Sequence, residues 1–490
     1  MHRSIADAGW RFDNSYARLP DTLFTPATAT LVRSPAIVVL NRPLAADLGL
    51  DAEVLGAEGA AVFAGNAPPP GAMPIAQAYA GHQFGQFTNL GDGRAILLGE
   101  HLTPDDRRFD IQLKGAGRTR YSRGGDGRAA LGPMLREFVV SEALHALGIP
   151  STRSLAVTTT GELVLREAPL PGAVLTRVAA SHIRVGTFQY AAALAGQSPL
   201  PPLLEHAIAR HDPELAGADD PAVAFLEAVV ERQAALVARW MLVGFVHGVM
   251  NTDNVAVSGE TIDYGPCAFL DAYDPATVFS SIDRQGRYAY ANQPTITHWN
   301  LARLAESLLP LVQGDEEAAL ESVQRVLGTF PERYERHRLA GARAKLGLLA
   351  EEDGDAGLVA ALLQRMHETR ADFTATFAAL ARWAEAGMSA EERCGSPDIE
   401  GWCDLWRERL TRQPGTLAEA AARMRRVNPV VIPRNHRIEE ALAAAEMGDF
   451  SPLHRLVAVL RSPFDETPEN LPYRSGPPAG CGPYRTFCGT

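Results

Sequence analysis

Two short stretches of the chain contain residues whose types and spacing could support metal-assisted phosphate chemistry. HGVMNTDN spans 247–254 and ends in Asn254, and Asp263 follows nine residues later in IDYG. Side-chain oxygens of Asn and Asp are hard ligands of the kind that Mg²⁺ prefers. Each residue alone is common at a turn or a strand end, so the two together predict a metal site formed by Asn254 and Asp263.

The first stretch has the spacing of the protein-kinase catalytic loop, H-R-D-L-x-x-x-N. His247 and Asn254 match its first and last positions, but Val249 stands where the catalytic Asp would be. IDYG is similar to the D-F-G segment, whose Asp holds metal in kinases. Asp253 is the remaining carboxylate of the loop and is interpreted either as a base acting from another position or as a turn residue.

Lys114 ends the apolar run 109–114, as the corresponding Lys ends V-A-I-K in kinases. In kinases that Lys pairs with a Glu on the next helix. The helix expected over 133–147 offers Glu137 and Glu142, and we favour Glu137 because it lies nearer the helix start. A lone Lys at a strand end is commonly a solvated surface residue. The comparison of Lys114 with the kinase Lys therefore depends on the order Lys, Glu, Asn, Asp along the chain.

Glycines and arginines near Lys114 could contact phosphate. GDGR (91–94) and GGDG (124–127) would let backbone N–H groups approach an anion, although plain turns have the same composition. Arg177 and Arg184 are seven residues apart and would share a face if their segment were helical. Arg suits forked contacts with phosphate, and a solvated basic face is the alternative.

The surrounding pattern predicts a strand-rich half with one prominent helix, followed by a helical half. Runs at 91–100 and 108–115 predict a β-hairpin, and more strands are expected over 151–179. Helices dominate from about 203. NVAVSGETIDYG (254–265) predicts a strand, a tight turn and a second strand, which would bring the two proposed metal ligands together.

Composition restricts the partners of the chain. It has 490 residues, of which 46% are hydrophobic, and a formal net charge of −12, so neither nucleic acid nor a membrane is an expected partner. We expect no secretory signal, because the N-terminus has no continuous apolar core, and no apolar run reaches the ~20 residues of a membrane span. Five scattered cysteines without a Cys-x-x-Cys pair favour a cytoplasmic location.

Together these motifs resemble the selenoprotein O family of protein adenylyltransferases, kinase-like proteins once classed as pseudokinases. The resemblance covers nearly the whole chain. Beside the stretches already quoted, it includes AYAGHQFGQF (78–87), DIQLKGAGRTRYSRGGDGRA (110–129), LREFVVSEALHALGIPSTR (135–153), DRQGRYAYANQP (283–294) and NPVVIPRNHRIEEAL (428–442).

The resemblance implies an α+β fold of the protein-kinase-like, two-lobed kind. A β-rich N-lobe would span 76–200, and a helical C-lobe carrying the metal site would span 201–425. Residues 1–75 and 426–490 would be N- and C-terminal extensions, the latter with a Cys-containing tail.

The implied activity is transfer of AMP from ATP, or of UMP from UTP, to Ser, Thr or Tyr hydroxyls of proteins, with release of pyrophosphate. The family binds ATP reversed relative to kinases, which would explain a base at Asp253 and none at Val249. Asn254 and Asp263 would hold Mg²⁺ or Mn²⁺, and Glu137 would pair with Lys114. The residues implied to hold the nucleotide are Gly91, Gly93, Arg94, Lys114, Asp126, Gly127, Arg177 and Arg184.

Two other functions fit part of the pattern, since fold does not determine function. The absent Asp at Val249 argues against a kinase that transfers the γ-phosphate. A non-catalytic nucleotide-binding scaffold would need no complete metal site. The resemblance also suggests that Cys488 matches a redox-active position and could form a regulatory disulfide with Cys267 or Cys481, the alternative being a flexible tail with ordinary thiols.

Overall fold

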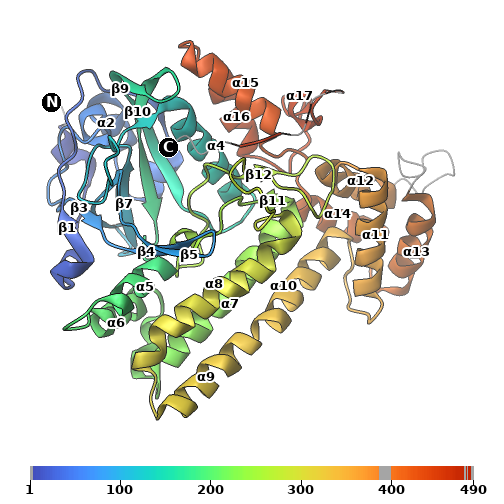
Figure 1. Ribbon diagram of the computed structural model, residues 1–490. Coiled ribbons are helices and arrows are strands. Elements are labelled where there is room, and N and C mark those ends of the chain that lie inside the picture. The colour runs from blue at the N-terminus through green and yellow to red at the C-terminus, as the bar shows by residue number, and fades with distance from the viewer. Residues whose placement is uncertain (1–3, 386–398, 479, 481, 483, 487–490) are drawn as a thin grey trace.

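The strands lie in the N-terminal half of the chain and the C-terminal half is mostly helical, which confirms the expected mixed α+β organisation (Figure 1). The computed structural model describes residues 4–385, 399–478, 480, 482 and 484–486. Eight strands form an antiparallel sheet in the order β1-β3-β6-β7-β10-β9-β2, with β8 paired to β10. These strands are β1 (Phe24–Pro26), β2 (Ala36–Leu40), β3 (Ile75–Gln77), β6 (Ala95–Leu102), β7 (Arg108–Lys114), β8 (Ala129–Ala130), β9 (Arg153–Leu165) and β10 (Pro169–Ala179).

Lys114 occupies an interior position of this sheet. The predicted hairpin is confirmed, because β6 pairs with β7 and places Ala95 opposite Lys114. On its other side Lys114 lies opposite Leu175 of β10. A strand with neighbours on both sides has its backbone groups paired along both edges, so the position of Lys114 is fixed by the ladder.

The first 75 residues are part of the same layer. They supply β1 and β2 and three short helices, α1 (Arg42–Asp47), α2 (Ala52–Glu58) and α3 (Ala60–Phe63). Leu48 and Leu55 from these helices pack in one apolar cluster with Ile96 of β6 and Ile111 of β7. Burial of these side chains stabilises the face of the sheet opposite α4 (Leu131–Ala146).

Helix α4 is apolar around most of its circumference and is buried on two sides. Leu135 and Phe138 pack against Val157 and Leu175 of the sheet. The same cluster contains side chains of α15 (Asn435–Glu446) and α16 (Ser451–Leu460), which stand beside α4 in Figure 1. A helix that is hydrophobic all round needs such cover, so the C-terminal segment holds α4 against the sheet.

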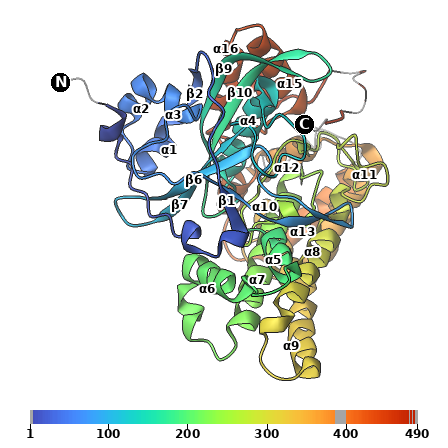
Figure 2. The same cartoon turned by 60° about the vertical axis from the view of Figure 1, so that its left-hand side comes forward.

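The remaining helices build the C-terminal half, and α7, α8, α9 and α10 extend away from the sheet in both ribbon views (Figures 1 and 2). No helix in the described ranges is long and apolar enough to cross a membrane. The elements of this half, with the small hairpin that precedes it, are β4 (Ala80–Gln83), β5 (Gln86–Asn89), α5 (Val185–Ala193), α6 (Leu200–His211), α7 (Pro221–Val243), β11 (Phe245–Val246), β12 (Ala268–Phe269), α8 (Gln293–Leu308), α9 (Glu316–Gly328), α10 (Phe330–Lys345), α11 (Asp355–Thr369), α12 (Phe373–Glu385), α13 (Glu400–Arg412), α14 (Leu417–Val427) and α17 (Leu471–Arg474).

The segment 254–265 differs from the predicted strand, turn and strand. Its turn is present, since the Gly259 N–H donates to the carbonyl of Ala256 at 3.1 Å. The two flanking runs, however, bond to separate partners: the first to 183–185, and Thr261 to Pro150 and Thr152. Their backbone groups are satisfied in this way, so the surrounding fold, rather than a local hairpin, places Asn254 and Asp263.

Candidate active site

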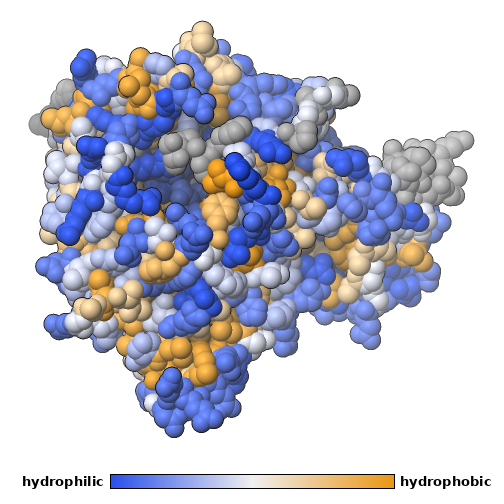
Figure 3. Space-filling view, viewed as in Figure 1, coloured by the Kyte–Doolittle hydropathy of each residue, from blue (hydrophilic) through white to orange (hydrophobic). Residues whose placement is uncertain are grey.

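A cleft of ≈ 510 Å³ opens between the sheet and the segment 249–266. Figure 3 shows a hollow lined mainly by hydrophilic side chains where the two halves meet, with hydrophobic side chains on the surface beside it. The cleft lining contains most of the residues singled out by the sequence: Gly91, Gly93, Arg94, Lys114, Asp126, Gly127, Glu137, Asp253, Asn254 and Asp263. Residues 172 positions apart in the chain therefore share one site.

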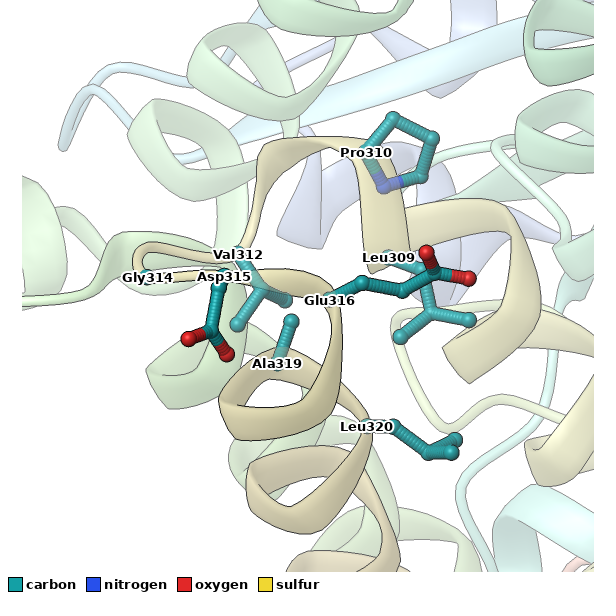
Figure 4. A pocket seen from close by; sticks show the side chains of 8 residues that line it. All are labelled: Leu309, Pro310, Val312, Gly314, Asp315, Glu316, Ala319 and Leu320. Atoms are coloured by element: carbon teal, nitrogen blue, oxygen red, sulfur yellow. The ribbon is translucent and has the colours of Figure 1, made fainter.

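A second, smaller cavity of ≈ 360 Å³ lies where α8 leads into α9 (Figure 4). Its lining is largely apolar, and its charged members are Asp315 and Glu316. Asp315 caps α9, because its side chain accepts the Ala318 N–H. None of the residues predicted to do chemistry lines this cavity, so we place the candidate site in the larger cleft.

Four buried or half-buried charges form a cluster at the wall of the larger cleft, and three of them, Lys114, Glu137 and Asp263, line it. The Lys114 ammonium donates to Glu137 Oε2 at 2.7 Å and to Asp263 Oδ1 at 2.6 Å. Arg177 reaches the same two carboxylates, Glu137 through Nε and Asp263 Oδ1 through Nη2 at 2.8 Å. Glu142, the competing candidate, pairs with Arg153 instead. Two cations and two anions balance, as buried charges require.

This cluster keeps its carboxylates ionised. Burial alone would raise the pKa of Asp263, but Lys114 and Arg177 hold that pKa well below its usual range. The same two cations lower the pKa of Glu137 against the effect of its burial. Asp263 also adopts a left-handed backbone conformation, with φ of 71°, which costs energy in a residue other than glycine and often marks a functional position.

The donor set around Asn254 and Asp263 fits a small divalent cation. Asn254 donates through Nδ2 to the carbonyl of Val249 at 3.0 Å, and its side-chain oxygen is buried with no partner in the described part of the chain. About a third of the Asp263 side chain is exposed. The described residues contain no cluster of three His, Cys, Asp or Glu that could hold a metal. Two oxygen ligands are enough for Mg²⁺ when phosphate oxygens complete the shell.

Asp253 lies in the same wall of the cleft and is almost fully buried. Its Oδ1 has no hydrogen-bond partner among the described residues. Burial raises the pKa of Asp253 to about 6. Strand β4 packs closely against the carboxyl group, because a Cβ added at Gly81 would lie only 2.1 Å from Oδ1. Because Asp253 also lines the cleft, its carboxyl group is a candidate to take a proton from a group that enters the cleft.

The glycines of the opposite wall allow close backbone packing. A Cβ at Gly91, whose φ is 124°, would lie 2.4 Å from the Tyr121 ring. A Cβ at Gly127 would lie 2.1 Å from the carbonyl of Gly117. Asp126 beside it pairs with Arg166 at 2.9 Å. These contacts bring backbone and cationic groups to one side of the cleft, where an anion could be bound.

Arg177 and Arg184 do not lie on one helix, because Arg177 belongs to β10 and Arg184 is the residue before α5. Extended backbone at 176–179 comes from pairing with β7 and β9. Both side chains are buried behind the cleft lining. Arg184 stacks on the ring of Tyr79 with 4.3 Å to the centroid and donates to the backbone carbonyl of Asp253 at 3.0 Å.

His247 connects the two segments that carry the candidate metal ligands. Its Nε2 lies 2.9 Å from the carbonyl of Ile262, and its backbone N–H donates to Gln293. Burial lowers the pKa of His247, so the ring is neutral and has a structural role. It links the loop that ends in Asn254 to the residue before Asp263.

The C-terminal tail reaches the same region. Thr486 donates through Oγ1 to the carbonyl of Pro266 at 2.7 Å, and Arg136 bonds both the carbonyl of Cys267 and the hydroxyl of Tyr484. Cys267 is a free, buried thiol, and burial raises its pKa to about 12. Cys481 and Cys488, its predicted disulfide partners, lie outside the described residues.

Several cleft residues were missed by reasoning from the sequence. They include Tyr79, Gln83, Phe84, Tyr121, Arg123, Arg128, Arg166 and Ile282. Arg166 illustrates the difficulty, because it lies 40 positions from its partner Asp126 and has no local motif. Phe84 and Ile282 carry no chemistry that a motif search would select.

Known proteins similar to this chain cover its whole length. A family model described as "Protein adenylyltransferase SelO" matches residues 8–461. The protein nucleotidyltransferase YdiU of Geobacillus kaustophilus strain HTA426 is 59% identical over 486 residues, which is 99% of this chain and 100% of that protein. YdiU of Anoxybacillus flavithermus has the same identity and coverage. YdiU of Rhizobium etli strain CIAT 652 is 56% identical over 497 residues, covering 100% of this chain and 99% of its own.

Proposed function

This chain belongs to the SelO family of protein adenylyltransferases and is a protein nucleotidyltransferase, and from this membership we propose a reaction and the residues that perform it. AMP passes from ATP to a Ser, Thr or Tyr hydroxyl of a protein, and pyrophosphate is released. The observation that carries the assignment of residues is the single cleft lined by Lys114, its two carboxylate partners and Asp253. A nucleotide-binding scaffold would have no need of that buried carboxylate.

We assign the architecture to the protein-kinase-like class. Residues 76–200 form the β-rich lobe and 201–425 the helical lobe, with 1–75 and 426–490 as extensions. In support, a Lys at a strand end pairs with a Glu on the helix that covers the sheet. An Asn and an Asp face that pair from the other wall of the cleft, as the kinase arrangement requires.

ATP would bind in the cleft in the reversed orientation, which brings the α-phosphate towards Asp253. Lys114 and Arg94 would contact phosphate oxygens, and the backbone at Gly91, Gly93, Asp126 and Gly127 would line the opposite wall. Arg177 and Arg184 complete the proposed nucleotide site. They lie behind the cleft lining, where Arg177 donates to Asp263 and Arg184 stacks on Tyr79. They would therefore act on the nucleotide through their charge and through these two partners.

Asn254 and Asp263 would hold Mg²⁺ or Mn²⁺, which when bound neutralises charge on phosphate oxygens. In the transfer, the acceptor hydroxyl oxygen bonds to the α-phosphorus and its proton passes to Asp253. The bond from the α-phosphorus to the bridging oxygen breaks, and its electron pair leaves with pyrophosphate. Lys114 and Arg94 stabilise the charge that develops on this leaving group.

Replacement of Gly81 by alanine is expected to lower kcat for AMP transfer by about 10- to 100-fold, since a displacement near 1 Å at a reacting group costs that much. The new Cβ would lie 2.1 Å from Asp253 Oδ1 and 2.9 Å from Leu90 Cδ1, so the carboxyl group must move. Initial rates and ATP affinity would be measured together. Gly357→Ala in α11 is the matched control, because no atom lies within 4 Å of a Cβ at that position. Equal rates in both variants would contradict the proposed position of the base.

The reaction itself is tested with ATP labelled at the α- or the γ-phosphate. Each sample is incubated with the protein, Mg²⁺ and a general protein acceptor such as casein. The expected result is protein-bound α-label and no protein-bound γ-label. Protein-bound γ-label would identify a kinase, and absence of both labels would favour a nucleotide-binding scaffold.

A further inference from the structure

The hairpin of β4 and β5 covers the loop that carries Asp253. His82 on β4 donates its backbone N–H to Thr252 Oγ1 at 2.7 Å. Phe84 at the tip donates its N–H to Asn251 Oδ1 at 3.0 Å. The tip is therefore held at a fixed position beside the proposed base.

The tip has an unusual residue for its conformation. Gln83 pairs with Gln86, so the turn consists of Phe84 and Gly85, with φ of 50° and 89°. Two-residue turns with two left-handed positions favour Asn or Gly at the first. A phenylalanine there costs conformational energy, and strain of this kind is retained where it serves a function. This turn places the partly exposed ring of Phe84 in the cleft lining, at what we call the mouth of the cleft.

A second apolar side chain lies at the same mouth. Phe84 is 38% exposed and Ile282 is 51% exposed, and both line the cleft. Ile282 comes from a different segment, whose Tyr288 supports the hairpin: its ring lies 5.2 Å from that of Phe84, and its hydroxyl donates to Asn251 Oδ1 at 2.6 Å. Two separate segments therefore present apolar surface beside Asp253. Phosphate and metal binding make no use of such surface, which leaves the acceptor protein and the adenine ring of ATP as the groups that could contact it.

We propose that Phe84 and Ile282 form the docking site for the acceptor protein and select segments in which an apolar side chain flanks the modified hydroxyl. This inference rests on the proposed AMP transfer. The occupant follows from continuity with the cleft, since the acceptor hydroxyl must enter past this mouth to reach Asp253. Burial of exposed apolar side chains on binding is favourable through the hydrophobic effect.

The test uses two peptides of equal length and charge, each with one serine, flanked by leucines in one and by glutamines in the other. Transfer of α-label from ATP is measured with the full chain. The wild type is expected to favour the leucine peptide by about tenfold in kcat/KM. A small hydrophobic pocket typically discriminates between two substrates by a factor of this size. Phe84→Ala and Ile282→Ala should each remove most of that preference by raising KM for the peptide. KM for ATP should stay unchanged, and Phe84→Leu should restore part of the preference.

Phe87→Ala is the matched control, because Phe87 is on the same hairpin and 46% exposed but does not line the cleft. It should retain the preference. Melting temperatures of all variants separate loss of docking from loss of folding. Equal labelling of both peptides, labelling of casein but of neither peptide, or an unchanged preference in Phe84→Ala would overturn the docking site and leave AMP transfer standing. Absence of α-label from casein and both peptides would overturn the proposed reaction, and the docking site with it.

Discussion

Asp263→Ala is expected to lower AMP transfer by at least about 10³-fold, the scale seen when a main group that stabilises transition-state charge is removed. Asp263 is one of the two proposed metal ligands. It also accepts hydrogen bonds from Lys114 at 2.6 Å and Arg177 at 2.8 Å. Its loss would therefore remove a ligand and release two cations from their place at the cleft wall.

The measurement is the initial rate of α-label transfer, together with Mn²⁺ binding in the presence of ATP. Asp263→Asn keeps the shape of the side chain and should also be inactive, because it lacks the anionic charge. Asp274→Ala is the control. Like Asp263, Asp274 lies in the segment between β11 and α8, but it does not line the cleft. Melting curves are needed, because Lys114 and Arg177 would share Glu137 as their one remaining carboxylate in this cluster. Wild-type transfer or Mn²⁺ affinity in Asp263→Ala would refute the metal site.

Asp253→Asn is expected to lower kcat by about 10²- to 10⁴-fold, the usual contribution of a general base. The substitution is isosteric and Asp253 Oδ1 has no partner to lose, so the local fold should be preserved. ATP affinity should change by less than about twofold, because a base acts in the transition state and not in ground-state binding.

This variant distinguishes the two interpretations of Asp253. The rate constant for transfer and the dissociation constant of ATP would be measured on the same preparations, with Asp274→Asn as the matched control. A base predicts a lower kcat at constant ATP affinity. If kcat stayed at the wild-type value, Asp253 would be a turn residue and the proton would need another acceptor.

Much of the centre of the site could be predicted from local patterns. Lys114, Glu137, Asn254 and Asp263 were named because their residue types recur in one order along the chain, and the structure brings them to one cleft. The hairpin of β6 and β7 and helix α4 were also predicted, since each has its own periodicity and turn residues. The segment 254–265 was predicted wrongly as a hairpin because its two runs bond to residues 183–185 and 150–152, far away in the chain, and not to each other.

Glu137 and Glu142 lie on one helix, and the sequence favours Glu137 only through its place nearer the helix start. Glu137 faces Lys114, while Glu142 faces Arg153. That outcome depends on how α4 is rotated against the sheet. Packing against β9 and β10 on one side and α15 and α16 on the other sets that rotation.

Residue types and their spacing were sufficient to identify the family and the proposed metal ligands, because these features are encoded in short segments with a fixed chemical task. Contacts between segments far apart in the chain could not be read in the same way. The packing of Gly81 against Asp253, the pairing of Asp126 with Arg166 and the place of Phe84 and Ile282 in one cleft lining arise only when these segments come together in the fold. Such contacts depend on the register and packing of whole elements, which no local pattern specifies.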